Sequence, residues 1–498
     1  MTIATYDIGT TAVKGVLINE KGEVLSSVSK TISTIFDNEK KEQRPQDWFD
    51  AFCGISKGFA AMDKGTPVEA VIMSGQMQDV IPVDREGCPV GNAVLYSDGR
   101  AADQARELIE RMGTDYLESV TGNHYDGSLP LPKLMWIKEN QPDLYGKIHK
   151  VLISAKDYII LRLTGRAVGD MTACSTAGAM NMALGAWDSR ILSAAGIDPS
   201  LMPELYYPHQ AVGTLSKKGA EATGFAEGVR IYAGVGDAGA ATLASGIRRP
   251  GEYNINLGTS GWVSTISREV SRGSEGIFNL AAMEQGAYIN VVPFLNAGNV
   301  HKWISSLFTA RDSRKNIDYP YVEERLRESR LGSGGVVFLP YLNGERFPVM
   351  DSLVKGSFLG ITAATGQGDM IRSCLEGVAF SIRQGIECIG VPPKNISVIG
   401  GGGRVGVWNQ ILADILNQTV YVYKDGEMLP ALALGAAVLL AEGRIQGYSE
   451  FTDSLQSRER SVAYKPDPER AAFYDVLYQR YLDIYPAVKR YYHGERMK

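Results

Sequence analysis

A carboxylate, a glycine, two hydroxyls and a cation lie within one short stretch near the amino terminus. They are Asp7, Gly9, Thr10, Thr11 and Lys14. Glycine lets backbone N–H groups come close to a phosphate, the threonine hydroxyls add donors, and the lysine adds positive charge. Asp7 can hold a divalent cation through water. The stretch therefore predicts a phosphate-binding tip, and the alternative is an ordinary hairpin with a Gly-Thr turn.

A second copy of this pattern lies in the second half of the chain. Strand-like residues lead into Gly258, Thr259 and Ser260 and strand-like residues follow them, as they do at the first tip. One tip in each half indicates an internally duplicated chain whose halves face each other across a cleft. We expect both tips to contribute to binding the phosphates of one nucleotide.

A further carboxylate, Asp237, stands where a predicted strand at 229–233 meets the start of a helix of small residues. Glycines on both sides of it, Gly236 and Gly239, would let a substrate and a phosphate come close to the backbone. This placement predicts a general base at the floor of the cleft. The alternative is an aspartate that only caps the helix.

Two loops carry short polar side chains at strand ends, which suits hydrogen bonding to a polyol. The first is Ser74-Gly75-Gln76-Met77-Gln78-Asp79, which follows a buried strand, and the second is Tyr96-Ser97-Asp98-Gly99-Arg100, which precedes a charged amphipathic helix. Loops at strand ends are where binding residues concentrate. Asp98 can instead cap the helix that follows it, and the two interpretations are compatible.

A glycine cluster at 400–403, followed by Arg404, lies between a predicted strand and a predicted helix. It is not the G-x-G-x-x-G of a dinucleotide fold, and the chain contains no G-x-x-x-x-G-K-[ST] phosphate loop. The cluster favours a flat surface against which an adenosine can lie.

The elements that must position these residues alternate between strands and helices, which predicts an α/β fold. A strand meander surrounds the first tip, a proline-entered helix begins at Pro45, and a core helix covers 431–441. A chain of 498 residues exceeds the usual limit of one core. The glycine-rich link at 246–251 therefore predicts two domains, 1–246 and 252–498, with one phosphate tip in each.

Composition restricts the partners. A 44% apolar content is typical of a globular protein, and a net charge of −5 argues against a nucleic-acid-binding surface. The longest apolar run is too short to span a bilayer, and no signal peptide is expected, so the prediction is a cytoplasmic protein. The five cysteines are scattered and read as reduced thiols, and the histidines lack zinc-ligand spacing. A homodimer is one candidate assembly.

These segments, in this order, resemble the FGGY carbohydrate kinases over nearly the whole chain. Residues 128–140 meet the first family signature, and 356–376 meet the second except at Cys374. Within the family, residues 42–48, 74–77, 97–100, 344–346 and 430–431 are most similar to those of xylulokinases. The resemblance implies a two-domain actin-like, or ribonuclease H-like, ATPase fold with a catalytic cleft between the domains.

The resemblance also implies ATP and Mg²⁺, and it assigns roles to individual residues. Asp237 would be the catalytic base and would hold Mg²⁺ together with Asp7. The phosphates would be bound by Gly9, Thr10, Thr11, Lys14, Gly258, Thr259 and Ser260. The nucleoside would face Gly298, Gly400, Gly401, Gly402 and Arg404. The sugar pocket would be lined by Met77, Gln78, Asp98 and Asp237.

Two departures from the xylulokinase pattern fall in this sugar pocket. Met77-Gln78-Asp79 replaces the usual Met-His-Gly, and Asp237-Ala238 replaces Asp-Asn. A site that hydrogen-bonds particular hydroxyls discriminates strongly, so these changes bear on the substrate. A pentulose such as D-xylulose is expected, and ribulose, erythritol, gluconate and autoinducer-2 are alternatives. A non-kinase actin-like ATPase and a catalytically lapsed sugar sensor are the rival classes, although no span is left over for an extra domain.

Overall fold

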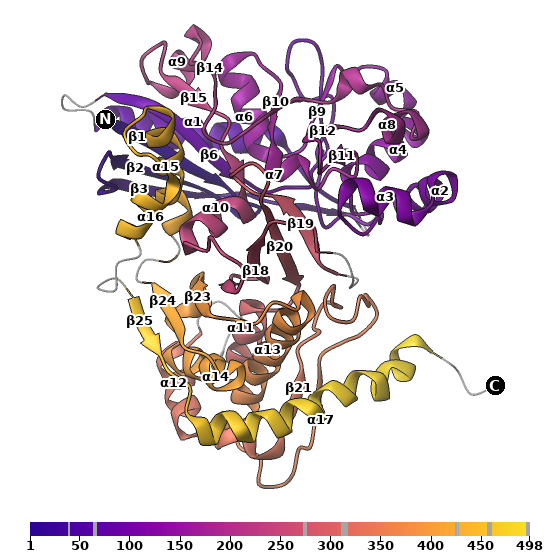
Figure 1. Ribbon diagram of the computed structural model, residues 1–498, viewed down its shortest axis with the longest axis vertical. Coiled ribbons are helices and arrows are strands. Elements are labelled where there is room, and N and C mark those ends of the chain that lie inside the picture. The colour runs from indigo at the N-terminus through magenta and orange to yellow at the C-terminus, as the bar shows by residue number, and fades with distance from the viewer. Residues whose placement is uncertain are drawn as a thin grey trace.

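The structure is a computed structural model of the whole chain. It describes residues 1–37, 40–62, 67–271, 276–309, 317–423, 426, 428–455 and 461–494. Two large sheets, one in each half of the chain, organise these residues into two lobes (Figure 1). We call them the first lobe and the second lobe. The predicted α/β architecture is confirmed.

The first sheet has the order β14-β15-β6-β1-β2-β3, with β16 also paired to β6. Its strands are β1 (Thr2–Ile8), β2 (Ala12–Asn19), β3 (Val24–Thr31), β6 (Val68–Gly75), β14 (Ala211–Thr214), β15 (Arg230–Tyr232) and β16 (Val235–Gly236). Strands β1, β2 and β3 form the predicted antiparallel meander, and β6 runs parallel to β1. Strand β1 is buried along nearly its whole length because helices cover both faces of the sheet.

The second sheet repeats this order as β19-β20-β18-β17-β23-β24-β25. Its strands are β17 (Glu252–Leu257), β18 (Gly261–Ser267), β19 (Phe278–Ala281), β20 (Tyr288–Phe294), β23 (Asn395–Ile399), β24 (Val420–Tyr423) and β25 (Ser461–Tyr464). Here β17, β18 and β20 form the antiparallel part, and β23 runs parallel to β17. The repeated order supports the duplication that the two tips indicated.

Helices cover both faces of the first sheet. Helices α1 (Pro45–Ala61) and α6 (Ala155–Thr164) pack on one face, and α10 (Asp237–Ser245) packs on the other. Helices α15 (Leu429–Ala441) and α16 (Tyr448–Leu455) come from the second half of the chain but also pack on this face of the first lobe (Figure 1). The predicted core helix at 431–441 is therefore present, and it binds the two halves of the sequence together.

Smaller elements complete the first lobe. Its remaining helices are α2 (Ala102–Met112), α3 (Thr114–Thr121), α4 (Pro130–Asn140), α5 (Pro142–Tyr145), α7 (Met171–Cys174), α8 (Ser189–Ala194), α9 (Lys217–Thr223) and the 3₁₀ turn η1 (Pro199–Leu201). Its remaining strands are β4 (Ile35–Asp37), β5 (Lys40–Gln43), β7 (Ile81–Val83), β8 (Ala93–Val94), β9 (Lys150–Leu152), β10 (Val168–Asp170), β11 (Met180–Asn181), β12 (Ala186–Trp187) and β13 (Glu204–Tyr206).

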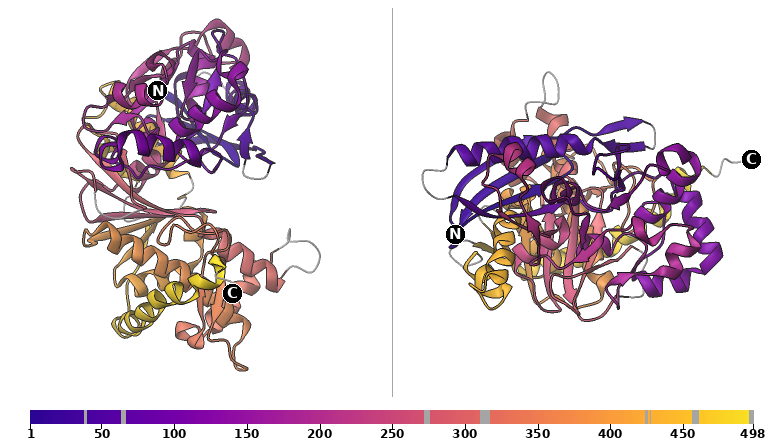
Figure 2. Two further views of the ribbon diagram at one scale, coloured as in Figure 1. Left: turned by 90° about the vertical axis from the view of Figure 1, so that its right-hand side faces the viewer. Right: turned by 90° about the horizontal axis from the view of Figure 1, so that it is seen from above.

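Figure 2 shows the two lobes stacked, with strands of the second sheet between them. The remaining elements of the second lobe are α11 (Gly298–Thr309), α12 (Tyr319–Glu328), α13 (Gln367–Ile389), α14 (Gly406–Leu416), α17 (Pro468–His493), β21 (Val337–Leu339), β22 (Ser357–Leu359), η2 (Leu331–Gly335) and η3 (Gly401–Arg404). Helix α17 is the last element of the described chain. Within the described chain, no helix combines the length and apolar character needed to cross a membrane, and the five cysteines are free thiols.

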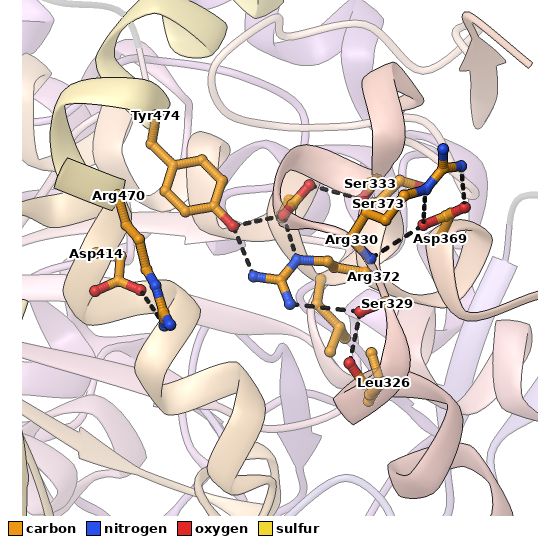
Figure 3. Close-up of polar contacts among 12 residues, drawn as sticks. Leu326, Ser329, Arg330, Ser333, Asp369, Arg372, Ser373, Asp414, Arg470 and Tyr474 are labelled. Carbon is orange, nitrogen blue, oxygen red and sulfur yellow. Dashed lines mark hydrogen bonds and ion pairs between the residues drawn. The ribbon is translucent and has the colours of Figure 1, made fainter. Parts of the chain in front are cut away.

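A buried polar network holds three helices of the second lobe together (Figure 3). On α13, Arg372 Nε donates to Glu376 Oε1 over 2.7 Å, and Tyr474 of α17 donates to the same oxygen. Ser333 donates to the other carboxylate oxygen over 2.7 Å. Arg372 also reaches Ser329, at the end of α12, over 3.4 Å. The network therefore fixes α12, which forms one wall of the cleft described next.

Candidate active site

Asp7 and Asp237 lie at neighbouring strand ends in the first sheet. Strand β6 runs between them: Asp7 of β1 is opposite Ser74, and Gly236 of β16 is opposite Gly75. Ser74 Oγ donates to Asp7 Oδ1 over 2.9 Å. Two carboxylates that are 230 residues apart in sequence are brought together because both flanking strands are parallel to β6.

The carboxyl groups of Asp7 and Asp237 are both harder to ionise than usual. Burial raises the pKa of Asp7, and burial together with the charge of Asp7 raises the pKa of Asp237 to about 7. A divalent cation would relieve this repulsion, so the pair fits one. The described residues contain no cluster of three or more potential metal ligands. Phosphate oxygens and water would therefore have to complete the coordination shell, as is usual for Mg²⁺ bound with a nucleotide.

The backbone before Asp237 is held by a hydrogen bond to a buried ion pair. Gly236 N–H donates to Asp170 Oδ1 over 3.2 Å, and Lys156 Nζ lies 2.8 Å from Asp170 Oδ2, with both side chains fully buried. A Cβ on Gly236 would lie 2.0 Å from the Met77 sulfur, so a larger residue there would force the Met77 side chain to move. Helix α10 begins at Asp237 itself, whose carboxylate accepts from the Ala238 amide over 2.8 Å.

The first tip is tied to the loop after β6 by a ring of hydrogen bonds. Thr10 Oγ1 donates to Gln76 Oε1 over 2.6 Å, and Gln76 Nε2 donates to Gln43 Oε1 over 3.1 Å. Gln43 Nε2 closes the ring by donating to the Thr10 carbonyl over 2.7 Å. The Thr10 hydroxyl is thus occupied within the protein, while Thr11 and Lys14 are exposed. Sequence analysis assigned Gln43 no role at the tip.

A cleft of 760 Å³ opens between the lobes. The first lobe contributes Asp7 and Lys14 to its lining. The second lobe contributes the predicted residues Gly258, Thr259, Gly298, Gly400, Gly401, Gly402 and Arg404. The other predicted phosphate-binding residues, Gly9, Thr10, Thr11 and Ser260, are neighbours of these along the chain and lie outside the lining set. The structure therefore brings most of the predicted nucleotide residues to one cleft.

The second tip is held by the start of α11. Gly298 N–H donates to the Gly258 carbonyl over 2.8 Å, and Asn299 N–H donates to the Thr259 carbonyl over 3.0 Å. Leu257, the last residue of β17, lies against the glycine turn, where a Cβ on Gly400 would come within 2.8 Å of its carbonyl group. The turn at 400–402 and the second tip therefore form one continuous backbone surface.

Three aromatic residues that sequence analysis did not identify also line the cleft. His301 lies with its ring centroid 5.8 Å from that of Tyr319 and 5.9 Å from that of Trp408. Burial lowers the pKa of His301 to about 4, so this ring is neutral near pH 7. The three residues come from different helices, and no local pattern links them. They give the cleft an apolar wall suited to a flat ring.

The predicted sugar-pocket loops lie beside Asp237, but several of their polar groups already form hydrogen bonds within the protein. Gln78 has a left-handed backbone with φ of 62°, and its carbonyl accepts from Lys133 Nζ over 3.2 Å. Asp79 is buried near Lys133, and burial raises its pKa. Asp98 accepts from Arg100 Nε over 2.8 Å and from the Lys41 amide over 2.7 Å.

Both carboxylate oxygens of Asp98 are therefore occupied by groups of the protein. Burial alone would raise the pKa of this carboxyl, but its hydrogen bonds to Arg100 and Lys41 lower the pKa overall. Asp98 is also not a helix cap, because α2 begins after Ala101 with no side-chain cap. Arg100 extends this arrangement to Glu42, at 2.6 Å, and lies over the Trp136 ring.

Both halves of the chain match domains of one protein family. The N-terminal domain of the FGGY family of carbohydrate kinases matches residues 2–244, and the C-terminal domain matches residues 253–442. Xylulose kinase of Staphylococcus xylosus is 30% identical over 490 residues, which cover 96% of this chain and 98% of that protein. Gluconokinase of Bacillus licheniformis is 29% identical over 499 residues, which cover 98% of this chain and 96% of that protein.

Solved structures agree with these sequence matches. The crystal structure of ligand-bound xylulose kinase from Lactobacillus acidophilus superposes with a TM-score of 0.90 at 26% identity, over 99% of each chain. This agreement confirms the predicted two-domain, actin-like fold. The chain therefore belongs to the FGGY family of carbohydrate kinases and is a phosphotransferase that acts on an alcohol group.

Proposed function

We propose that the enzyme transfers the γ-phosphate of ATP to a hydroxyl of a small sugar, and that Asp237 is the catalytic base. The observation that carries the proposal is the convergence of Asp7 and Asp237 at neighbouring strand ends, beside a cleft lined by residues of both lobes. In this assignment, the sugar binds in the first lobe near Met77 and Gln78. The nucleoside lies in the second lobe, along the turn at 400–402.

Asp237 would orient the sugar hydroxyl and accept its proton while the oxygen attacks the γ-phosphorus in line. The glycine-rich tips would place backbone N–H groups around the phosphates, and Lys14 and Arg404 would add positive charge. Mg²⁺, held by Asp7 and Asp237, supplies further neutralisation of the phosphate charge when it is bound. Because water competes as a nucleophile, we expect the lobes, which divide near 246–251, to close once sugar is present.

The substrate proposed is a neutral pentulose such as D-xylulose. The relatives named xylulose kinase support this choice. Gluconate is the second candidate, because a gluconokinase is nearly as similar in sequence.

The test is ADP release by the purified enzyme with Mg²⁺ and ATP, measured without sugar and with D-xylulose, D-ribulose, erythritol or D-gluconate. We expect release to depend on sugar and to be fastest with a pentulose. Fastest release with D-gluconate would move the assignment to the second candidate. Equal release with and without every sugar would instead identify an ATPase and contradict the proposal.

A further prediction concerns the second tip. Gly298→Ala would place a Cβ about 2.4 Å from the Gly258 carbonyl oxygen, so the tip must shift. Overpacking costs about 1–3 kcal/mol, which predicts a rise of roughly 5- to 150-fold in the Kd for ADP. Isothermal titration calorimetry measures this value. Gly58→Ala on α1, where a Cβ meets open space, is the matched control. Unchanged ADP affinity in Gly298→Ala would show that the tip does not bind phosphate.

A further inference from the structure

One arginine of the second lobe reaches the first lobe beside the sugar loops. Arg346 follows β21, and its Nη2 donates to Ser128 Oγ, at the entry to α4, over 3.2 Å. Its guanidinium carbon lies 5.5 Å from the centroid of the Phe278 ring on β19. Its charge is within electrostatic reach of Tyr96 and Lys133, which lie in and beside the sugar loops. The side chain therefore spans the boundary between the lobes at the sugar side of the cleft.

The backbone of Arg346 is anchored to the nucleotide side. The Arg346 amide donates to Glu345 Oε1 over 2.9 Å, and the Leu295 amide donates to the same oxygen over 2.6 Å. Asn296 Nδ2 donates to the other oxygen of this buried carboxylate over 2.9 Å. Asn296 is two residues before Gly298, which contacts the second phosphate tip. Glu345 thus fixes both the backbone of Arg346 and the loop at 295–298 that leads to the second tip.

The guanidinium has more donors than its protein contacts use. An arginine carries five N–H donors, and the contact to Ser128 uses one of them. Along the described ranges, no carboxylate forms an ion pair with Arg346, whereas Arg100 in the neighbouring loop pairs with both Asp98 and Glu42. A half-buried cation held in place without an acidic partner is ready to bind oxygen atoms of a ligand.

We propose that Arg346 is a substrate-binding, specificity-determining residue of the second lobe, which donates hydrogen bonds to oxygen atoms of the sugar away from the hydroxyl that Asp237 deprotonates. The inference rests on the proposed function and deepens it. The sugar would be held between a carboxylate of one lobe and a cation of the other. Sugar binding would then favour closure of the lobes, because the site is complete only when they meet.

The test compares Arg346→Met, Arg346→Lys and Ser128→Ala with the wild-type enzyme, using the sugar that the wild type phosphorylates fastest. We expect Arg346→Met to lower kcat/KM for that sugar by about 10- to 100-fold, mostly through KM, as for loss of hydrogen bonds from a charged donor. Arg346→Lys should recover only part of this loss, because lysine keeps the charge but not the planar fork. In Arg346→Met, the Kd for ADP measured by calorimetry should stay within about threefold of the wild-type value, because Arg346 does not line the nucleotide cleft.

Ser128→Ala distinguishes a substrate-binding role of Arg346 from a purely structural contact between the lobes. It removes the contact to Arg346 but leaves the guanidinium, so kcat/KM should stay within about threefold of wild type. Equal losses of kcat/KM in Ser128→Ala and Arg346→Met would show that the contact is only structural and would overturn the proposal. A wild-type KM for the sugar in Arg346→Met would also overturn it. Failure of the proposed function is distinguishable, because it would appear as no sugar-dependent ADP release in the wild-type enzyme.

Discussion

Asp237→Asn is expected to lower kcat for sugar phosphorylation by on the order of 10² to 10⁴-fold, the range of a general-base contribution. The amide keeps the size of the side chain and can still accept from the Ala238 amide, but it cannot take a proton from the substrate hydroxyl. The backbone at Asp237 is fixed by the contact of Gly236 with Asp170, so the substitution should not disturb the strand end.

Steady-state ADP release and calorimetric titration with ADP measure the two sides of this prediction. The Kd for ADP should remain within a few-fold of wild type, because the second lobe supplies most of the cleft lining. Asp103→Asn, on the exposed surface of α2, is the matched control and should behave as wild type. Unchanged turnover in Asp237→Asn would refute its role as the base, and a large loss of ADP affinity would point to a role in nucleotide binding instead.

Glu376→Ala is expected to lower the free energy of unfolding by about 3–5 kcal/mol. The substitution leaves the Arg372 guanidinium buried without its carboxylate and removes the acceptor of both Tyr474 and Ser333 (Figure 3). An uncompensated buried charge is among the largest effects that a single substitution produces. Urea denaturation followed by tryptophan fluorescence measures the change.

The same helix offers a matched control. Arg383 and Glu387 of α13 form an ion pair with the same spacing of four residues, but the Glu387 side chain is 50% exposed, against 2% for Glu376. Glu387 also accepts from the Tyr478 hydroxyl over 2.7 Å. Glu387→Ala should therefore cost about 1–2 kcal/mol, the sum of an exposed ion pair and one hydrogen bond. Similar losses in the two variants would show that the interior network does not stabilise the second lobe beyond a surface ion pair.

The candidate chemistry-bearing residues of the chain could be named from sequence. Glycines beside hydroxyls marked both tips, and a carboxylate between glycines marked Asp237, because close approach to a phosphate requires these residue types within a few positions. The meander around the first tip and the helix at 431–441 also followed from apolar runs and turn residues.

Contacts between distant segments were not readable in this way. Sequence did not show that His301, Tyr319 and Trp408 share one wall, or that Arg346 reaches Ser128. These pairs join different helices and different lobes, so no spacing along the chain encodes them.

The sequence by itself determined which residues could handle a phosphate and that two similar halves would carry them. The tertiary structure decided which of these residues meet. The order of parallel strands around β6 places Asp7 beside Asp237, and the docking of α15 and α16 on the first lobe ties the halves together. The physical reason is that periodicity and turn chemistry act over a few residues, whereas strand order and packing are set by burial across the whole molecule.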